Sequence, residues 1–478
     1  MGTVKRVART PRAAGASGAK GGKPWKSTRR SFLRNTSVAV AGVVAAGPAA
    51  ARAATDAPAR DVDVLVCGGG CAGIAAALAA SRRGAKTLLI ERAGFAGGII
   101  TSVGLPYFDG IADFKSKKIV VRGIARELLS KSGVCAPDAT EIDKHNPTIR
   151  NVEAFKRLAD QLLLAESSNL SVLYHTLACD ARIEGDRVAE VTIANKGGLT
   201  RIRPKVVIDC TGDADIAQWA GCPTEKAPEL QPMTMHFRIG NVKPSKDIGL
   251  RCRAALEIAQ ARGELPMFYG PGIMFMFAPN EVYVHAVRVP GDATDPAEFT
   301  RAEIQGRSDA WAMFEAWKKD VPSFEESYFI SSGPYMGVRE TRRIVGQYVL
   351  TEQDITSTRA FDDAIATGCW YLDRHPNKTT TGTANVGPKI QPAPYDIPYR
   401  SLLPQKVGNL LVAGRCHSAT TNAASSTRVT CTAMGMGEAA GAAAAMAMIA
   451  GRLPQEIRGA DVRVELTKRG GGVVQDFG

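Results

Sequence analysis

A glycine-rich turn at residues 68–73 has the residue types and spacing of a nucleotide-binding site. Gly68, Gly70 and Gly73 follow the pattern G-x-G-x-x-G, and Glu91 comes 23 positions after Gly68. The first glycine permits a tight turn, the second lets the backbone approach a pyrophosphate, and the third allows close packing of helix and strand. A carboxylate at Glu91 can accept a hydrogen bond from a ribose hydroxyl. The motif predicts a dinucleotide site, and by itself it does not distinguish NAD from FAD.

The sequence around this turn predicts the strand, helix and strand that the motif requires. Residues 61–67 are a short apolar run rich in valine, typical of a strand buried in a parallel sheet. Residues 72–83 are rich in alanine and stop before Gly84, so we predict a helix there. Residues 87–90 give the second strand, and Glu91 stands at its tip.

The rest of the chain leaves this pattern and then returns to it. Residues 151–167 have apolar residues at helical spacing behind an asparagine cap, and residues 171–209 predict short antiparallel strands that rejoin the central sheet. Residues 223–397 have few clear periods and more aromatic residues, and we interpret them as a second, substrate-facing domain. Residues 409–413 then predict a buried strand, and residues 433–449 predict a helix of small residues.

Five further blocks of sequence resemble the FAD-dependent oxidoreductases that have a glutathione-reductase-like nucleotide fold. The blocks are Glu91-Arg92 followed by Gly97-Gly98, and residues 207–213, 337–343, 395–400 and 411–415. They occur in the family's order, and the resemblance covers nearly all of residues 60–450. It implies FAD as the cofactor and an α/β fold, in which a Rossmann-like FAD-binding domain carries an inserted α+β substrate domain.

The domain boundaries that we predict combine these patterns. They are an export signal at residues 1–53, a first part of the FAD-binding domain at 60–222, a substrate domain at 223–397, a second part of the FAD-binding domain at 398–455, and a loose tail at 456–478.

The motif and the resemblance together imply a set of cofactor contacts around the glycine turn and at the later blocks. In the family's fold, the helix after Val429 and Thr430 presents its positive N-terminal end to the flavin pyrimidine. The predicted cofactor-binding residues are Gly68, Gly70, Cys71, Ala72, Gly73, Glu91, Arg92, Gly97, Gly98, Thr211, Gly212, Asp213, Gly414, Arg415, Val429 and Thr430.

Candidate catalytic residues are fewer, because the flavin supplies most of the chemistry. His417 follows the block at Gly414 and Arg415, and a neutral imidazole can act as a base near working pH, although a structural histidine is an equal alternative. His236 and His375 are the next candidates. Arg339 lies in a charged stretch that is either a substrate or flavin contact or a solvated surface.

Cysteine usage predicts neither a metal site nor a redox pair. The ten cysteines show no haem-attachment motif and no paired C-x-x-C zinc pattern. Cys67 and Cys71 flank the glycine turn, where we expect them to pack as small buried residues.

The positive charge of the chain is concentrated at its start. Residues 1–53 hold eleven Lys and Arg and no Asp or Glu, which leaves 49 basic against 47 acidic residues in the rest of the chain. A nucleic-acid partner is therefore not expected. Residues 28–34, T-R-R-S-F-L-R, precede a short apolar run and an A-x-A site, and they resemble a twin-arginine export signal. The run is shorter than the roughly 20 residues that span a bilayer, so we expect export to the periplasm or beyond without a stable membrane anchor.

The sequence thus predicts an exported FAD enzyme that oxidises a small organic molecule, of the alcohol, sugar or amine class, by hydride transfer. Its expected partners are that substrate, oxygen or another electron acceptor, and the twin-arginine export machinery. Two alternatives remain open at this point. One is a secreted flavin-binding protein without turnover, and the other is an NAD-dependent dehydrogenase.

Overall fold

The computed structural model describes residues 58–143, 147–149, 151–265, 269–375 and 390–477. All of these residues belong to one compact unit. The predicted export signal at residues 1–53 lies outside the described residues.

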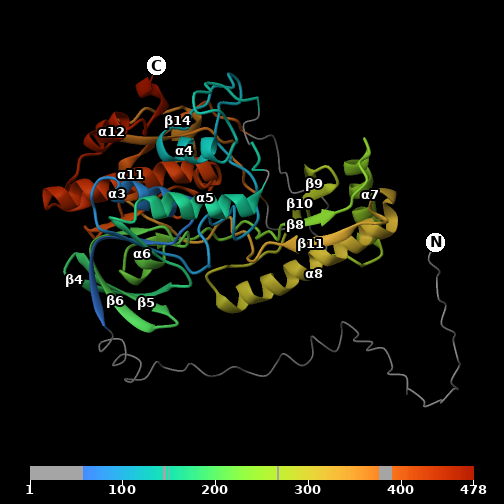
Figure 1. The fold of residues 1–478 in the computed structure, drawn as a ribbon, viewed down its shortest axis with the longest axis horizontal. Coiled ribbons are helices and arrows are strands. Elements are labelled where there is room, and N and C mark those ends of the chain that lie inside the picture. The colour runs from blue at the N-terminus through green and yellow to red at the C-terminus, as the bar shows by residue number, and fades with distance from the viewer. Residues whose placement is uncertain (1–57, 144–146, 150, 266–268, 376–389, 478) are drawn as a thin grey trace, which may run out of the picture. The chain divides into compact units, whose positions relative to one another are not determined.

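A seven-stranded sheet forms the centre of the larger part of the fold (Figure 1). Its order is β3-β2-β1-β6-β5-β4, and β15 also pairs with β6. The strands β1, β2, β3, β6 and β15 run parallel, whereas β4 and β5 complete an antiparallel meander with β6. Their bounds are β1 (Ala59–Cys67), β2 (Thr87–Ile90), β3 (Leu170–Leu173), β4 (Leu177–Glu184), β5 (Arg187–Asn195), β6 (Gly198–Asp209) and β15 (Leu410–Val412).

The register brings the carboxyl ends of four parallel strands to one edge of this sheet. Cys67 at the end of β1 pairs with Ile90 of β2 and with Asp209 of β6, and Asp209 also pairs with Val412 of β15. Each of the sequence blocks that follow these strands therefore starts at the same edge, which is where open α/β sheets bind ligands.

Alternate residues of the parallel strands face two different layers. Val64 and Val66 pack with the helices α3 (Cys71–Ser81), α4 (Gly123–Lys131), α5 (Val152–Ala165) and α11 (Thr430–Ala450). Leu65 and Cys67 pack on the other face with α6 (Asp215–Trp219) and the β4–β5 strands. Burial on both faces explains why these strands read as continuous apolar runs.

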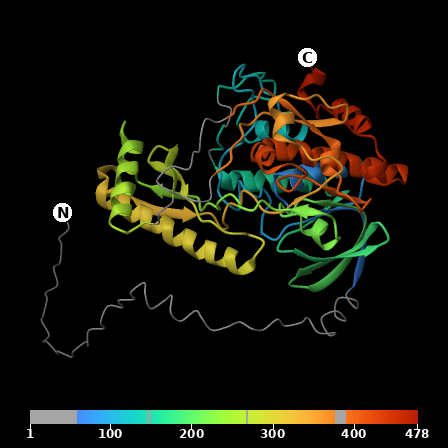
Figure 2. The ribbon, with the colours of Figure 1, turned by 180° about the vertical axis from the view of Figure 1, so that it is seen from behind.

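Small residues let α11 lie directly against α3, so the first and last parts of the described chain are side by side (Figures 1 and 2). A Cβ atom on Gly437 or Gly441 would overlap the backbone carbonyl oxygen of Ala72 or Ala76. By length and composition α11 could cross a membrane, but most of its residues are buried in this core. We therefore interpret α11 as a core helix.

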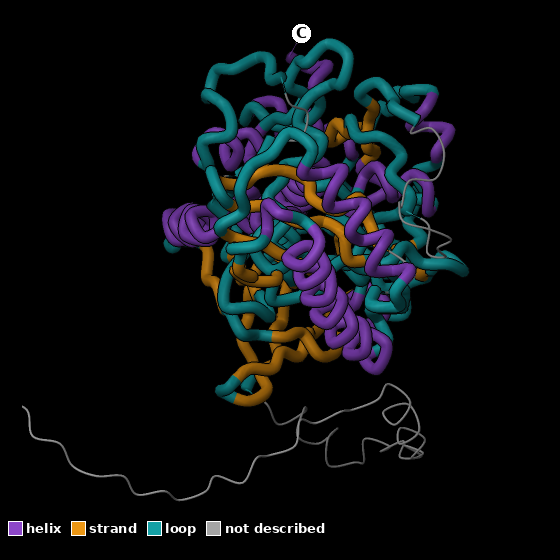
Figure 3. Tube along the Cα trace, turned by 90° about the vertical axis from the view of Figure 1, so that its right-hand side faces the viewer, coloured by secondary structure: helices purple, strands orange, loops and turns teal. Residues whose placement is uncertain are grey.

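A second sheet has its own apolar core on one side of the molecule (Figures 1 and 3). Its order is β11-β8-β10-β9, and two helices cover it. Trp317 stacks on Phe237 at the centre of this core, and Asp295 caps the long helix by accepting hydrogen bonds from the amides of Ala297 and Glu298. The elements are β8 (Phe237–Gly240), α7 (Ile248–Ala261), β9 (Tyr269–Ala278), β10 (Glu281–Val287), α8 (Pro296–Asp320) and β11 (Tyr328–Ser332).

Short elements connect the parts built on the two sheets and form the C-terminal end of the described chain. They are β7 (Thr224–Glu225), η1 (Pro322–Phe324), β12 (Arg343–Ile344), α9 (Glu352–Thr356), β13 (Ala364–Gly368), β14 (Tyr395–Pro398), η2 (Tyr399–Leu402), α10 (Thr421–Thr427), η3 (Pro454–Glu456), α12 (Gly459–Lys468) and η4 (Val474–Phe477).

The last segment differs from the loose tail that we predict for residues 456–478. It contains the helix α12, whose Val462 and Leu466 are fully buried and belong to the main core. These two residues are four positions apart, so they lie on one face of the helix. The two apolar residues anchor the segment despite its many charges.

Candidate functional site

A single cavity of about 730 Å³ lies at the edge where the parallel strands end. This volume is within the usual range of small-molecule and cofactor pockets. Of the predicted cofactor-binding residues, all but Gly73 and Gly97 line it. His236, His375 and Arg339 line the same cavity, whereas His417 is absent from its walls.

The glycine turn forms one wall, and each glycine has a separate reason to lack a side chain. Gly68 has φ +104°, and a Cβ there would come 2.5 Å from the carbonyl oxygen of Cys210. A Cβ on Gly73 would overlap the carbonyl oxygen of Gly68. At Gly70, which caps the N-terminus of α3, a Cβ would meet only the Cα of Gly98, at 3.9 Å. Gly70 therefore leaves open space in front of a helix N-terminus, where an anion is favoured.

Glu91 is fixed beside this turn by two backbone amides. The Gly69 amide donates to Oε2 at 2.7 Å, and the Ala93 amide donates to Oε1 at 2.8 Å. The carboxylate is 8% exposed and lines the cavity. Each carboxylate oxygen has a further lone pair, so Glu91 can still accept from a ribose hydroxyl.

The two glycines at 97 and 98 support the turn from behind. The Gly97 amide donates to the carbonyl of Gly69 at 2.8 Å, and a Cβ on Gly98 would come 2.8 Å from the Cα of Gly70. Both residues have positive φ. The contact with the Gly70 backbone explains why Gly98 has no side chain, and at Gly97 a Cβ would come 2.5 Å from the side chain of Thr101.

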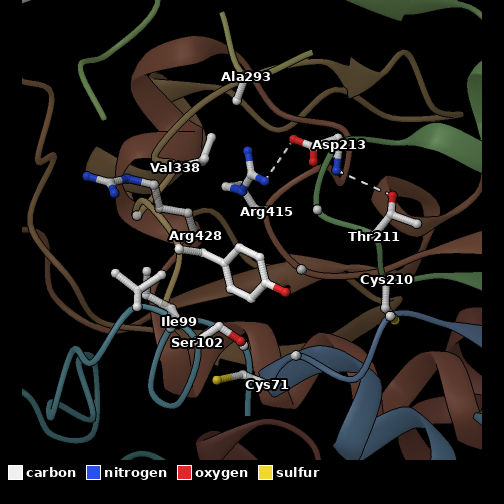
Figure 4. Close-up of a pocket in the computed structure, with 18 of the residues that line it drawn as sticks. Cys71, Ile99, Ser102, Cys210, Thr211, Asp213, Ala293, Val338, Arg415 and Arg428 are labelled. Carbon is white, nitrogen blue, oxygen red and sulfur yellow. Dashed lines mark hydrogen bonds and ion pairs between the residues drawn. The ribbon is translucent and has the colours of Figure 1, made fainter. Parts of the chain in front are cut away.

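The end of β6 contributes a polar wall that is tied to β15 (Figure 4). Thr211 donates to Asp209 at 2.7 Å, and Arg415, just after β15, donates to Asp213 at 2.8 Å. Asp215 pairs with Arg342 at 2.5 Å, yet burial and the nearby Asp209 and Asp213 raise the pKa of Asp215 to about 6. Figure 4 shows Arg415 pointing toward Asp213 from the adjacent strand end.

The N-terminus of α11 forms another part of the wall. Val429 is its N-cap, Thr430 is its first residue, and both line the cavity. The Thr430 hydroxyl accepts a hydrogen bond from the Asp109 amide at 2.8 Å. The short helix α10, which the sequence pattern did not predict, precedes α11 and has Arg428 as its C-cap. Two helix N-termini, those of α3 and α11, thus meet the same cavity.

Another part of the cavity wall carries two histidines, His236 just before β8 and His285 in β10. His236 and His285 stack with ring centroids 4.5 Å apart. His236 contacts the hydroxyl of Tyr283 through Nδ1, and His285 accepts a hydrogen bond from Arg339 at 2.8 Å. Backbone hydrogen bonds between Thr234 and Gly337, 2.8 and 2.9 Å long, hold the segment of Arg339 beside the strand of His236.

Both stacked histidines are held neutral. Burial, with Arg339 and Arg288 close by, lowers the pKa of His236 well below its ordinary value. Burial, Arg288 and the neighbouring His236 do the same to the pKa of His285. A neutral imidazole keeps one nitrogen lone pair and can receive a proton.

Asp373, His375 and Arg428 line the cavity beside these two histidines. The Asp373 carboxylate forms an ion pair with Arg428 at 3.5 Å and contacts His375 at 3.2 Å, and the Asp373 backbone carbonyl accepts a hydrogen bond from Arg428 at 3.1 Å. Burial and Arg339 lower the pKa of His375 to about 3. This carboxylate is thus shared between one guanidinium and one imidazole.

His417 is placed away from these groups. Its backbone amide donates to the carbonyl of Gly414 at 3.2 Å, and the resulting turn directs the ring to Thr427 at 2.7 Å. The side chain is fully buried, and burial with Arg343 nearby lowers its pKa to about 3. The structure therefore does not bring His417 together with His236 and Arg339.

Sequence reasoning missed His285 and Tyr283, although a local signal was available. The two residues are separated by one position in β10, between buried valines and alanine. Polar residues at i and i+2 of an otherwise apolar strand lie on one face of the sheet. That pattern indicates a polar site on a buried strand.

Cys67 and Cys71 pack as the buried residues that the sequence suggested, whereas Cys179 is exposed. Within the described residues all ten are free thiols, and Cys67 and Cys71 are buried. Burial raises the pKa of Cys71 to about 12, so this thiol is not a reactive thiolate although it lines the cavity.

The residues present fit an extended dinucleotide. The open space before Gly70, the fixed carboxylate of Glu91 and the second helix N-terminus stand along one cavity. These are the features that a pyrophosphate, a ribose and a negatively charged ring system need.

Comparison with known proteins agrees with this fit. The sequence model of the family described as "FAD dependent oxidoreductase" matches residues 63–466. A search of the curated proteins found no match.

Three solved structures show the range of similar folds. A geranylgeranyl bacteriochlorophyll reductase-like protein from Thermoplasma acidophilum is 14% identical, with 86% of this chain and 85% of that chain covered and a TM-score of 0.45. A flavin-dependent brominase is 14% identical, with 83% and 81% covered and a TM-score of 0.41. A p-nitrophenol 4-monooxygenase from Pseudomonas putida is 11% identical, with 82% and 80% covered and a TM-score of 0.39.

Proposed function

Because the chain belongs to the family of FAD-dependent oxidoreductases, we propose that it oxidises a small organic alcohol, sugar or amine at the histidine-lined wall of the cavity. The chain is an enzyme, and its cofactor is FAD. The earlier alternatives, a carrier without turnover and an NAD-dependent dehydrogenase, are set aside by this membership.

One observation carries the proposal. The neutral histidines His236 and His285 and the guanidinium of Arg339 line the same cavity as the glycine turn and the N-terminus of α11. When bound, FAD supplies the acceptor for the hydride that leaves a substrate C–H bond. The part of the cavity wall that carries His236, His285 and Arg339 must then provide a group that takes the proton from the substrate hydroxyl or amine.

His236 has the contacts that this role requires. In the tautomer with its proton on Nδ1, His236 donates to the hydroxyl of Tyr283 and keeps the lone pair on Nε2. Nε2 lies beside Gly337, which also lines the cavity, since a Cβ on Gly337 would be 3.6 Å from it. Oxidation of a CH–OH group releases one hydride and one hydroxyl proton, and His236 Nε2 accepts the proton.

The N-terminus of α11 supports the same reaction electrostatically. A helix N-terminus favours negative charge, and Arg428 immediately precedes Val429, the N-cap of α11. The cavity wall at Val429 and Thr430 therefore stabilises charge that builds up on the acceptor side.

Replacing His236 by alanine is expected to slow substrate-dependent flavin reduction by roughly 10²-fold or more, while FAD stays bound. Anaerobic stopped-flow bleaching of the flavin measures this rate once a reducing substrate has been found from a panel of alcohols, sugars and amines. His417→Ala serves as the comparison, because His417 does not line the cavity. If the rate of flavin reduction were unchanged in the His236 variant but much lower in the His417 variant, His417 and not His236 would be the base. Failure of the whole panel to bleach the flavin would remove the proposed reaction.

We also propose that residues 1–53 direct export through the twin-arginine machinery, with oxygen or another acceptor reoxidising the enzyme outside the cytoplasm. The paired arginines, the apolar run and the A-x-A site of the sequence support this. Cell fractionation tests it: replacing Arg29 and Arg30 by lysine should retain the protein in the cytoplasm, and unchanged export would refute it.

A further inference from the structure

Arg339 is a buried cation whose protein partners are all neutral. It is 8% exposed and lines the cavity. Its Nη1 donates to the carbonyl of Pro232 at 2.8 Å and to the hydroxyl of Thr234, and its Nη2 donates to His285. No carboxylate among the described residues pairs with it. A buried charge without a counter-charge is costly, and such groups usually mark a ligand site.

The donors that remain on Arg339 suit a planar anion. A guanidinium has five N–H groups, and the three hydrogen bonds of Arg339 use two on Nη1 and one on Nη2. The groups left over are one N–H on Nε and one on Nη2. These two nitrogens share one edge of the guanidinium, and such an edge binds both oxygens of a carboxylate.

The surroundings of Arg339 add positive charge. Arg288 donates to the same Thr234 hydroxyl at 2.6 Å, and its Nε is buried without a partner. Burial lowers the pKa of Arg288 to about 10, so it stays protonated at neutral pH. Arg428 lines the cavity and, with Arg288 behind the wall, places two further positive charges near Arg339, whereas Asp373 is the one carboxylate that attracts Arg339 noticeably. The charges therefore do not cancel.

We propose that the substrate carries a carboxylate, which binds to Arg339 with Arg288 behind it, so that the group to be oxidised lies next to His236. This inference rests on the proposed function for its chemistry and narrows it to alcohols or amines that are also acids. The arriving negative charge neutralises the excess at this wall. It also favours the protonated form of His236, because an anion nearby stabilises an imidazolium.

Simple carboxylates that cannot be oxidised test binding apart from turnover. Benzoate and acetate are titrated into the purified holoenzyme at constant ionic strength, and benzamide and acetamide are the neutral counterparts. The change in the visible flavin spectrum gives the dissociation constants. We expect each carboxylate to bind at least about tenfold more tightly than its amide in the wild type, and Arg339→Gln to remove that preference.

Two further variants make the result specific. Arg251→Gln removes one positive charge from the surface of α7, where Arg251 pairs with Asp247, and it should leave the preference unchanged. Arg339→Lys keeps the positive charge but lacks the two parallel N–H groups of a guanidinium, so it should retain an intermediate preference for the carboxylate. It also takes the place of Arg339→Gln in the titrations if the Gln variant loses its flavin. Equal binding of acid and amide by the wild type, or a full preference in Arg339→Gln, would overturn the inference.

Turnover separates this inference from the proposed function. Hydroxy acids and amino acids are compared with the neutral alcohols and amines of the same carbon skeleton, by anaerobic bleaching of the flavin. If carboxylates bind through Arg339 but no compound bleaches the flavin, the inference holds and the proposed reaction fails. If neutral compounds bleach wild type and Arg339→Gln equally fast, the reaction holds and the carboxylate inference fails.

Discussion

The Gly70→Asp variant should fold normally and purify without FAD. Gly70 has φ −71°, which any residue can adopt, and a Cβ there meets only the Cα of Gly98 at 3.9 Å. The new side chain would enter the open space before the N-terminus of α3. A carboxylate in that place faces the pyrophosphate, and juxtaposed like charges cost several kcal/mol, which is on the order of 100-fold or more in affinity.

The ratio of visible flavin absorbance to protein absorbance measures the cofactor content, and circular dichroism reports the fold. Gly70→Ala is the matched control, because it adds a Cβ to the same open space without a charge and should weaken FAD binding far less. A yellow Gly70→Asp protein would show that the pyrophosphate does not lie at this turn. Loss of the fold in both variants would show that Gly70 serves packing instead.

Gly437→Val is expected to yield little or no folded protein. A Cβ on Gly437 would overlap the carbonyl oxygen of Ala72, and the contact lies where both helices are buried. Backbone cannot move aside as a flexible side chain can, so α11 must separate from α3. Overpacking of a core typically costs 1–3 kcal/mol, and we expect about 3 kcal/mol or more for a branched side chain against backbone.

Soluble yield and the thermal unfolding midpoint of the holoenzyme measure this effect. Gly249→Ala is the control, because Gly249 is also helical, in α7, and a Cβ there meets nothing within 4 Å. That variant should be neutral or more stable by roughly 0.4–1 kcal/mol. A Gly437→Val protein with a wild-type midpoint would mean that the two helices do not touch at this position.

The sequence allowed the nucleotide side of the site to be predicted because its signals are local. Gly68, Gly70 and Glu91 belong to one strand–helix–strand unit, and periodicity alone indicates that unit. Asn151 likewise caps α5 as predicted, accepting from the Ala154 amide at 3.1 Å. Residues 177–209 form the predicted antiparallel strands, and β6 returns to pair with β1, whereas residues 171–173 belong to the parallel strand β3.

The wall that carries His236, His285 and Arg339 could not be predicted in the same way, because long-range pairing creates it. His236 and His285 meet only because β8 and β10 are neighbours in the second sheet, and Arg339 reaches them from beyond β11. His417, by contrast, follows a cofactor block in sequence, and one turn at Gly414 takes its ring into the interior. Proximity along the chain was therefore a poor guide to proximity in the cavity.

The contact between α3 and α11 has a consequence for how the protein is synthesised. Roughly 360 residues separate the start of α3 from the start of α11. A ribosome adds roughly 5–20 residues per second, so roughly 20–70 s pass between the synthesis of α3 and the synthesis of α11, the helix that packs against it. During that time the nascent chain presents a bare apolar helix and an unfinished sheet. The part of the proposed cofactor site formed by Gly414 and the N-terminus of α11 is also missing during that time, so we expect complete capture of FAD only after translation has almost ended.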